Sequence, residues 1–359
     1  MRRADRDLGS TRTRIRTRTR ARRPARPAGA GPLAPPPDPL TRSAGPSAPP
    51  PDPLTRPAGR RPHALPAALL VIAVATALAL VASGCGGTGG NSAAASAGEV
   101  PRPTVDRFNE RAALRLLRAQ VRLGPRPAGS PASRRLARNL ARLLPRGRLW
   151  PIPGHPGLRN VIGVVPGRNN SRTVVVGAHY DTKDLPGFVG ANDGASGPAV
   201  LTTLARQIRP RQFGPRLVFV LFDGEESPAG KPEGQFLRYG LRGSKAVAPH
   251  FADAEAMVLL DFVGERGLRL PRESLSNRAL WERLRAAAGR VGVEAVFPPG
   301  WRPGVLDDHI PFRRQGVPSI NLIDFEFECW HRLCDDLSVI SIRSLDAVGE
   351  AVYELLRDL

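Results

Sequence analysis

Four apolar runs of this sequence end on, or a few residues before, acidic or histidine side chains, the groups that bind metal ions and move protons. These side chains, with one from a glycine-rich loop (190–197), are His179, Asp193, Glu225, Glu226, Asp261 and His331. The runs, at 173–178, 216–222, 256–260 and 319–323, are rich in Val, Leu and Ile, which is typical of buried parallel strands. Ligands bind outside the carboxyl ends of such strands. Carboxylates gathered there without a cation would repel one another and take up protons, so the pattern predicts a metal centre.

The segments around these runs predict the rest of the fold. Helices are expected within 104–145, where Phe108, Ala112, Leu116 and Ala119 recur at helical spacing, and at 198–209, 236–247, 277–292 and 342–356. Two further strands are expected near 148–152 and 159–165. This order predicts one catalytic domain over 104–359, a three-layer α/β/α fold with a mostly parallel, mixed central sheet.

Residues 1–63 have the composition of a disordered tail. They hold 15 Arg against 4 Asp, and a proline-rich stretch occurs twice, at 34–42 and 48–56. A true start codon closer to Arg60 explains the segment equally well. The tail contributes +11 to the net charge of +21. The 50 Arg and 3 Lys of the chain fit a high-GC genome, and no nucleic-acid motif accompanies the charge, so we expect no nucleic-acid binding.

An export signal is predicted next. Arg60 and Arg61 precede an apolar stretch at 64–82, and the segment 81–85, ending in Ser83-Gly84-Cys85, resembles a bacterial lipobox. We therefore expect lipidation of Cys85, with 64–85 as signal peptide, although the apolar stretch is also long enough for an uncleaved anchor. Residues 86–103 are expected to be a flexible linker. Both alternatives predict an exported domain tethered to the outer side of the cell membrane of a high-GC bacterium.

Two more cysteines, Cys329 and Cys334, lie on either side of His331. In an exported protein they can form a small disulfide loop. Two buried free thiols fit the same spacing.

Six segments resemble, in the same order, those of the zinc aminopeptidase and glutaminyl cyclase family, metallopeptidase family 28. They are 177–181, 190–197, 222–226, 259–264, 307–312 and 330–331. Residues 124–130 also resemble the N-terminal helical region of that family. The resemblance covers about 105–359 and implies a zinc enzyme that acts on the N-termini of peptides or proteins.

The resemblance implies a role for each candidate residue. Asp193, Glu226 and His331 would be zinc ligands, which leaves the fourth position open as in catalytic zinc sites. Glu225 would be the general acid and base. In the two-zinc aminopeptidases, the positions of His179 and Asp261 hold a second metal ion, and a bridging hydroxide attacks the first peptide bond.

In the glutaminyl cyclases, one zinc polarises the side-chain amide of an N-terminal glutamine and the substrate's own amine attacks it. Residues matching Asp261 and Asp307 hold the acid–base glutamate in a carboxylate network, and Trp330, Phe327 and Asn321 would line the substrate pocket. The segment 307–323 is closer to the cyclases, whereas 227–234 lacks the tryptophan of the animal enzymes and Asn321 replaces a histidine. We therefore expect a one-zinc glutaminyl cyclase; the alternatives are a two-zinc aminopeptidase and a non-catalytic binding domain on the same scaffold.

Overall fold

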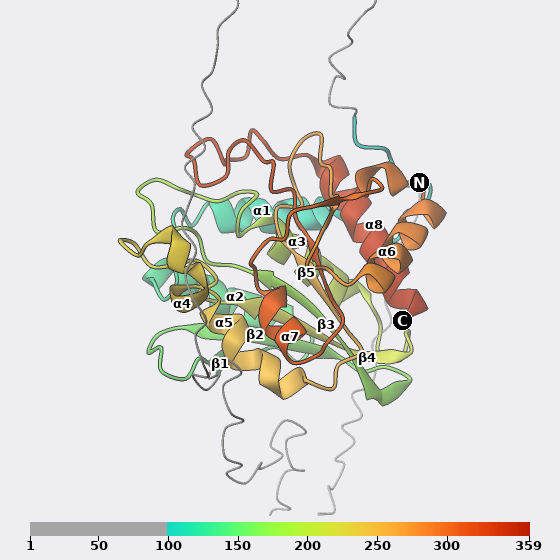
Figure 1. The fold of residues 1–359 in the computed structure, drawn as a ribbon, viewed down its shortest axis with the longest axis horizontal. Coiled ribbons are helices and arrows are strands. Elements are labelled where there is room, and N and C mark those ends of the chain that lie inside the picture. Colours follow the sequence, from blue (N-terminus) through green and yellow to red (C-terminus); the bar gives the residue numbers. More distant parts are fainter. Residues whose placement is uncertain (1–98) are drawn as a thin grey trace, which may run out of the picture. The chain divides into compact units, whose positions relative to one another are not determined.

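The structure, a computed structural model, describes residues 99–359 (Figure 1). The predicted tail (1–63), the export segment (64–85) and most of the predicted linker lie outside the described residues. Val100 is already buried in the core, so the packed region begins a few residues before the predicted position 104. Among the helices of residues 99–359, none combines the length and the apolar character needed to cross a membrane.

A six-stranded sheet forms the centre of the domain, with the order β1-β2-β4-β3-β5-β8. Its strands are β1 Arg148–Pro151, β2 Arg159–Val165, β3 Asn169–His179, β4 Pro215–Phe222, β5 Ala256–Leu260 and β8 Ser319–Leu322. The pairs β3–β4, β3–β5 and β5–β8 are parallel, whereas β1–β2 and β2–β4 are antiparallel. The predicted mixed, mostly parallel sheet is therefore confirmed.

Helices cover the two faces of this sheet (Figure 1). One layer consists of α1 Glu110–Val121, α2 Pro131–Leu143, α3 Ser196–Gln207, α6 Arg278–Arg290 and α8 Ile342–Asp358. The other consists of α4 Phe236–Tyr239, α5 Arg242–Val247, the short helix η2 Ala248–Phe251 and α7 His309–Arg314. Shorter elements complete the domain: η1 Glu233–Gln235, η3 Glu294–Val296 and the strand pair β6 Arg272–Glu273 and β7 Trp301–Arg302. This is the expected α/β/α arrangement.

Local sequence explains why these elements form where they do. All five residues of β5 are buried, as expected for a central parallel strand that is covered on both faces. The helix α2 begins at Ser130, whose side chain accepts a hydrogen bond from the Ser133 N–H, and Pro131 fits the first helical position. The helix α3 packs so closely on the sheet that a Cβ on Gly197 would lie 2.2 Å from the carbonyl oxygen of Leu260. Only glycine allows this approach.

Two predicted helices differ in detail from those observed. The buried face of α1 is formed by Ala113, Leu117 and Gln120, one residue beyond the spacing noted in the sequence, and Leu116 of that spacing is partly buried against the core. The reason is tertiary, because Gln120 Nε2 donates a hydrogen bond to the Ala195 carbonyl of the neighbouring loop. The helix expected at 236–247 is two short helices, since Leu241 adopts a left-handed conformation, with φ of 56°, between them.

Candidate metal centre

The predicted strand ends do meet at one edge of the sheet. In the parallel pair β3–β4, His179 lies opposite Phe222, so the segment 223–226 continues at the level of His179. In the pair β5–β8, Leu260 lies opposite Leu322, and Asp261 follows directly. Register alone therefore places the acids that follow β4 and β5 beside the histidine that ends β3.

Asp193 lies between two groups of possible metal ligands. The first group is His179, Asp193 and Asp261, and the second is Asp193, Glu226 and His331; within each, the ligand atoms all lie within 4.8 Å of one another. His179 Nε2 is 3.1 Å from Asp261 Oδ1 and 3.3 Å from Asp193 Oδ1. The structure thus brings together all five residues predicted from the sequence as metal ligands.

The second group mirrors the first on the other side of Asp193. His331 Nε2 is 3.0 Å from Glu226 Oε1 and 3.5 Å from Asp193 Oδ2. Each carboxylate oxygen of Asp193 therefore faces a different histidine. This is the arrangement in which one carboxylate can serve two adjacent cation sites.

The donor set fits zinc. Both carboxylate oxygens of Asp193 are buried and, among residues 99–359, have no hydrogen-bond partner. A buried carboxylate that accepts no hydrogen bond is costly, and a cation would remove that cost. Either group offers two carboxylates and one imidazole, the ligand types and number of a catalytic zinc site with an open position.

Burial and mutual repulsion shift the proton affinities of these groups. Burial raises the pKa of Asp193, and the charge of Glu226 raises it further. Burial alone would lower the pKa of His179, but the carboxylates of Asp261, Asp181 and Asp193 raise it well above its usual value. Without a cation, the cluster must therefore take up protons.

Glu225 has the environment of a general acid and base. It is buried beside Glu226 but belongs to neither ligand group. Burial and the charge of Glu226 raise the pKa of Glu225 well above its usual value, towards the pH range in which a carboxyl group can both accept and donate a proton. Glu225 lines the same pocket as Asp261 and Asp307, so the three acids of the predicted network are together.

A cavity of about 440 Å³ opens from the ligand groups. Trp330 lines it, as predicted, and Phe262, Leu306 and Phe325 add apolar wall. This is the size and character of a small-ligand pocket.

The other two predicted pocket residues lie behind its wall. Asn321 is fully buried, and its Nδ2 donates a 2.7 Å hydrogen bond to Asp307 Oδ2. Phe327 is almost fully buried and packs against Phe262. In the structure, these two residues support Asp307 and Phe262, which line the pocket.

Two buried aspartates, which the sequence did not single out, hold the backbone of the ligand loops. Asp181 accepts hydrogen bonds from the N–H groups of both Glu225 and Glu226, each at 3.2 Å. Asp335 accepts hydrogen bonds from Asn192 at 2.7 Å and Asp193 at 2.9 Å. The sequence signal for Asp335 was its position four residues after His331, which carries meaning only once the loop contacts are known.

A lysine near the ligand groups was also missed. Lys183 Nζ lies 3.2 Å from Glu226 Oε2 and lines the pocket. Burial would raise the pKa of Glu226, but the hydrogen bond from His331 and the charges of His331 and Lys183 lower it. Lys183 is one of only three lysines in the chain, and this rarity was the available signal.

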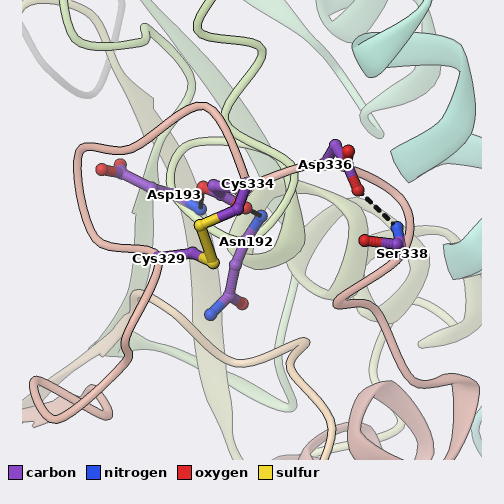
Figure 2. The surroundings of a disulfide bond; sticks show 7 residues. Asn192, Asp193, Cys329, Cys334, Asp336 and Ser338 are labelled. Atoms are coloured by element: carbon purple, nitrogen blue, oxygen red, sulfur yellow. Dashed lines mark hydrogen bonds between the residues drawn. A yellow bond between two sulfur atoms is a disulfide. The ribbon is translucent and has the colours of Figure 1, made fainter.

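A disulfide closes the loop that carries His331. Cys329 and Cys334 are bonded to each other, which decides between the two alternatives left by their spacing. Figure 2 shows this disulfide next to Asn192 and Asp193. His331, inside the loop, has a φ of 51°, a conformation that is uncommon for residues other than glycine. The disulfide therefore closes the loop around His331, and Asp335, which follows Cys334, ties the end of this loop to the backbone of Asn192 and Asp193.

Comparison with known proteins gives the family. The model of peptidase family M28 matches residues 160–356, more than half of the chain. The chain belongs to this family. It is 29% identical over 221 residues to the aminopeptidase YwaD of Bacillus subtilis, covering 55% of this chain and 45% of that protein. It is 28% identical over 234 residues to the glutaminyl-peptide cyclotransferase of Drosophila melanogaster, covering 55% and 63%.

A solved structure extends the similarity over a larger share of the chain. The glutaminyl cyclase of Porphyromonas gingivalis superimposes with a TM-score of 0.62 at 29% sequence identity, covering 71% of this chain and 99% of that one. The sequence alignments with the two relatives above span only about half to two thirds of their lengths. The M28 fold and membership of this family are thus established, and proteins named for both activities occur among the relatives.

Proposed function

We propose that this chain is a zinc-dependent glutaminyl-peptide cyclotransferase that converts an N-terminal glutamine into pyroglutamate and releases ammonia. The observation that carries the proposal is the position of Asp307 in the pocket beside Glu225 and Asp261. A single base suffices to activate water for hydrolysis. Three carboxyl groups can share and pass on a proton, which suits a reaction that takes a proton from one nitrogen and returns it to another.

The residues divide the reaction between them. Trp330 and the apolar wall would hold the glutamine side chain, and Asp193, Glu226 and His331 would hold the zinc ion. When bound, zinc supplies a Lewis acid that polarises the side-chain amide carbonyl. Glu225 accepts a proton from the substrate α-amine as that nitrogen attacks the side-chain carbonyl carbon. Glu225 then donates the proton to the amide nitrogen, the carbon–nitrogen bond breaks, and ammonia leaves.

The supporting residues fix the geometry of this transfer. Asp181 holds the backbone N–H of Glu225, and Asn321 holds one oxygen of Asp307. Both supporting residues are fully buried, so water does not compete for these hydrogen bonds. The proton acceptor therefore meets the substrate amine in a prearranged position.

A two-zinc aminopeptidase is the second candidate, because the group of His179, Asp193 and Asp261 offers a complete set of ligands for another cation. In that enzyme the same Glu225 would activate a water molecule, and the first peptide bond would break. The two candidates differ in product, so substrate chemistry separates them.

The test uses two peptides that differ only in their first residue, glutamine or leucine, incubated with the zinc-loaded protein. We expect the glutamine peptide to release ammonia and to lose the mass of one ammonia molecule, while the leucine peptide stays intact. An N-acetylated glutamine peptide is the control, since its blocked amine cannot attack. Release of free leucine would contradict the cyclase and support the aminopeptidase, and inertness towards both peptides would support a binding domain.

A further inference from the structure

A row of arginines follows the outer face of α1. Arg111, Arg115, Arg118 and Arg122 are all exposed and recur at intervals of four, three and four residues. At 100° per residue, these positions fall on one narrow stripe of a helix. The buried face of α1, formed by Ala113, Leu117 and Gln120, points the opposite way, so the arginine stripe faces solvent.

Carboxylates do not neutralise this stripe. Several arginines elsewhere in the domain form ion pairs, for example Arg172 with Glu255 and Arg285 with Glu294. On α1, within the described residues, only Arg111 has an acidic neighbour, Glu110 at 3.8 Å. Glu110 is also the only acidic residue of the helix. Within the described residues, Arg115, Arg118 and Arg122 therefore form a concentrated positive surface without an acidic partner.

The stripe leads into a surface hollow of about 580 Å³. Its rim carries Arg118, Arg266 and Arg343, and Val100, Leu114 and Leu337 add apolar surface. Leu337 is one of the few large apolar side chains of the described residues that are exposed, at 40%. Arginines beside an apolar surface match a ligand with an anionic head and an apolar remainder.

The hollow also contains the point at which the described chain begins. Glu99 lines it and forms an ion pair with Arg343. Cys85 lies fourteen residues before Glu99, and a chain of that length spans at most about 50 Å when fully extended. If Cys85 is held in a membrane, as the sequence predicts, the hollow can lie no more than about 50 Å from the lipid surface.

We propose that the arginine face, defined as Arg111, Arg115, Arg118, Arg122, Arg266 and Arg343 with the hollow between them, docks on anionic phospholipid headgroups. Its charge attracts the anionic surface, and the exposed Leu337 at the hollow contacts the region below the headgroup. Nucleic acid fits less well, because the face carries no aromatic side chain that could stack on bases. This proposal is independent of the reaction that the metal centre performs.

The test measures vesicle binding of residues 99–359, which contain a connected hydrophobic core from Val100 to Leu359 and lack the apolar stretch. We expect sedimentation with vesicles of equal parts phosphatidylglycerol and phosphatidylcholine, little with pure phosphatidylcholine, and weaker binding at high salt. The double variant Arg115→Gln, Arg118→Gln should bind about 25-fold more weakly, since each basic residue near an anionic surface strengthens binding about fivefold.

The control is Arg313→Gln with Arg314→Gln, which removes the same charge from exposed positions on α7 in the opposite helix layer. It should leave vesicle binding nearly unchanged, and both double variants should retain peptide turnover. The proposal is overturned if anionic vesicles do not bind, or if both variants weaken binding equally. It is also overturned if inorganic phosphate at constant ionic strength displaces the vesicles, which would indicate a free-anion site, or if duplex DNA binds the same face more tightly.

Discussion

At the scale of single residues, two adjacent glutamates have opposite tasks because their surroundings differ. Glu226 faces the imidazole of His331 and the ammonium group of Lys183, and these contacts favour the carboxylate that a metal ion needs. Glu225 faces other acids, and its burial favours the protonated form. Glu226 is therefore suited to bind a metal ion, and the adjacent Glu225 is suited to carry a proton.

Glu225→Gln tests this division of labour. The amide is the same size but cannot accept and return a proton, so we expect turnover to fall by about 100-fold or more. Zinc content should be unchanged, since the ligands are other residues. Zinc is counted by atomic absorption and turnover by ammonia release; full activity of this variant would show that Glu225 is not the acid and base.

At the scale of elements, the metal centre depends on contact between two loops that lie far apart in the sequence. The loop before α3 carries Asp193, and the loop after β8 carries His331. Asp335 joins them through hydrogen bonds to the backbone of the first loop. Burial and the charge of Asp193 raise the pKa of Asp335 to about 7. The negative charges of the two carboxylates therefore destabilise each other when no cation is bound.

Asp335→Asn should loosen this connection. An asparagine offers one acceptor oxygen where two N–H groups need one each, and we expect zinc affinity to fall about tenfold to a hundredfold. The matched control is Asp336→Asn, because the Asp336 side chain accepts a hydrogen bond from the nearby Ser338 N–H (Figure 2) and, within the described residues, none from the loop that carries Asp193. Competition with a chelator measures both affinities. Equal affinities for the two variants would mean that Asp335 does not position the ligand.

The elements differ in how well the sequence predicts them. Runs such as 256–260 match β5 residue for residue, because a strand buried on both faces is apolar throughout. The face of α1 and the break at Leu241 were not predictable, because partners distant in sequence decide them. The same holds in the metal centre, where histidines and acids after strands are recognisable but Asp181, Lys183 and Asp335 act through contacts that no local pattern encodes.

At the scale of the whole molecule, the fold buries many of its carboxyl groups. Many carboxylates of the described residues are buried around the sheet edge and between helices, whereas most arginines are exposed. The surface is therefore more positive than the composition alone indicates. The cost of this arrangement is a set of carboxyl groups that titrate within the neutral range.

Asp346 on α8 is such a carboxyl group, and it lies away from the metal centre, so its effect on stability can be measured separately. Burial and the charges of Glu110, Glu350 and Asp106 raise the pKa of Asp346 to about 7. In the unfolded chain its pKa is about 3.9. The folded state therefore holds the proton more tightly, and its stability falls as pH rises from about 4 to about 7.

Asp346→Asn removes the ionisable group, so the folded state no longer loses stability at this position as the pH rises. We expect a higher melting temperature than the parent above pH 7, by an amount corresponding to about 1 kcal/mol after allowance for solvent screening, and no gain near pH 4. Circular dichroism at the two pH values measures the difference. Asp253→Asn, at an exposed position, serves as control; an equal gain there, or a gain that persists at pH 4, would exclude this explanation.

The number of zinc ions needed for full activity tests the proposed function most directly. Metal-free protein is titrated with zinc while ammonia release from a glutamine-initiated peptide and leucine release from its leucine-initiated counterpart are followed together. The ligand set Asp193, Glu226 and His331 predicts that ammonia release reaches its plateau at one zinc per chain and that leucine is never released. A plateau only at two zinc ions per chain, accompanied by free leucine, would contradict the cyclase and assign His179 and Asp261 to a second catalytic metal.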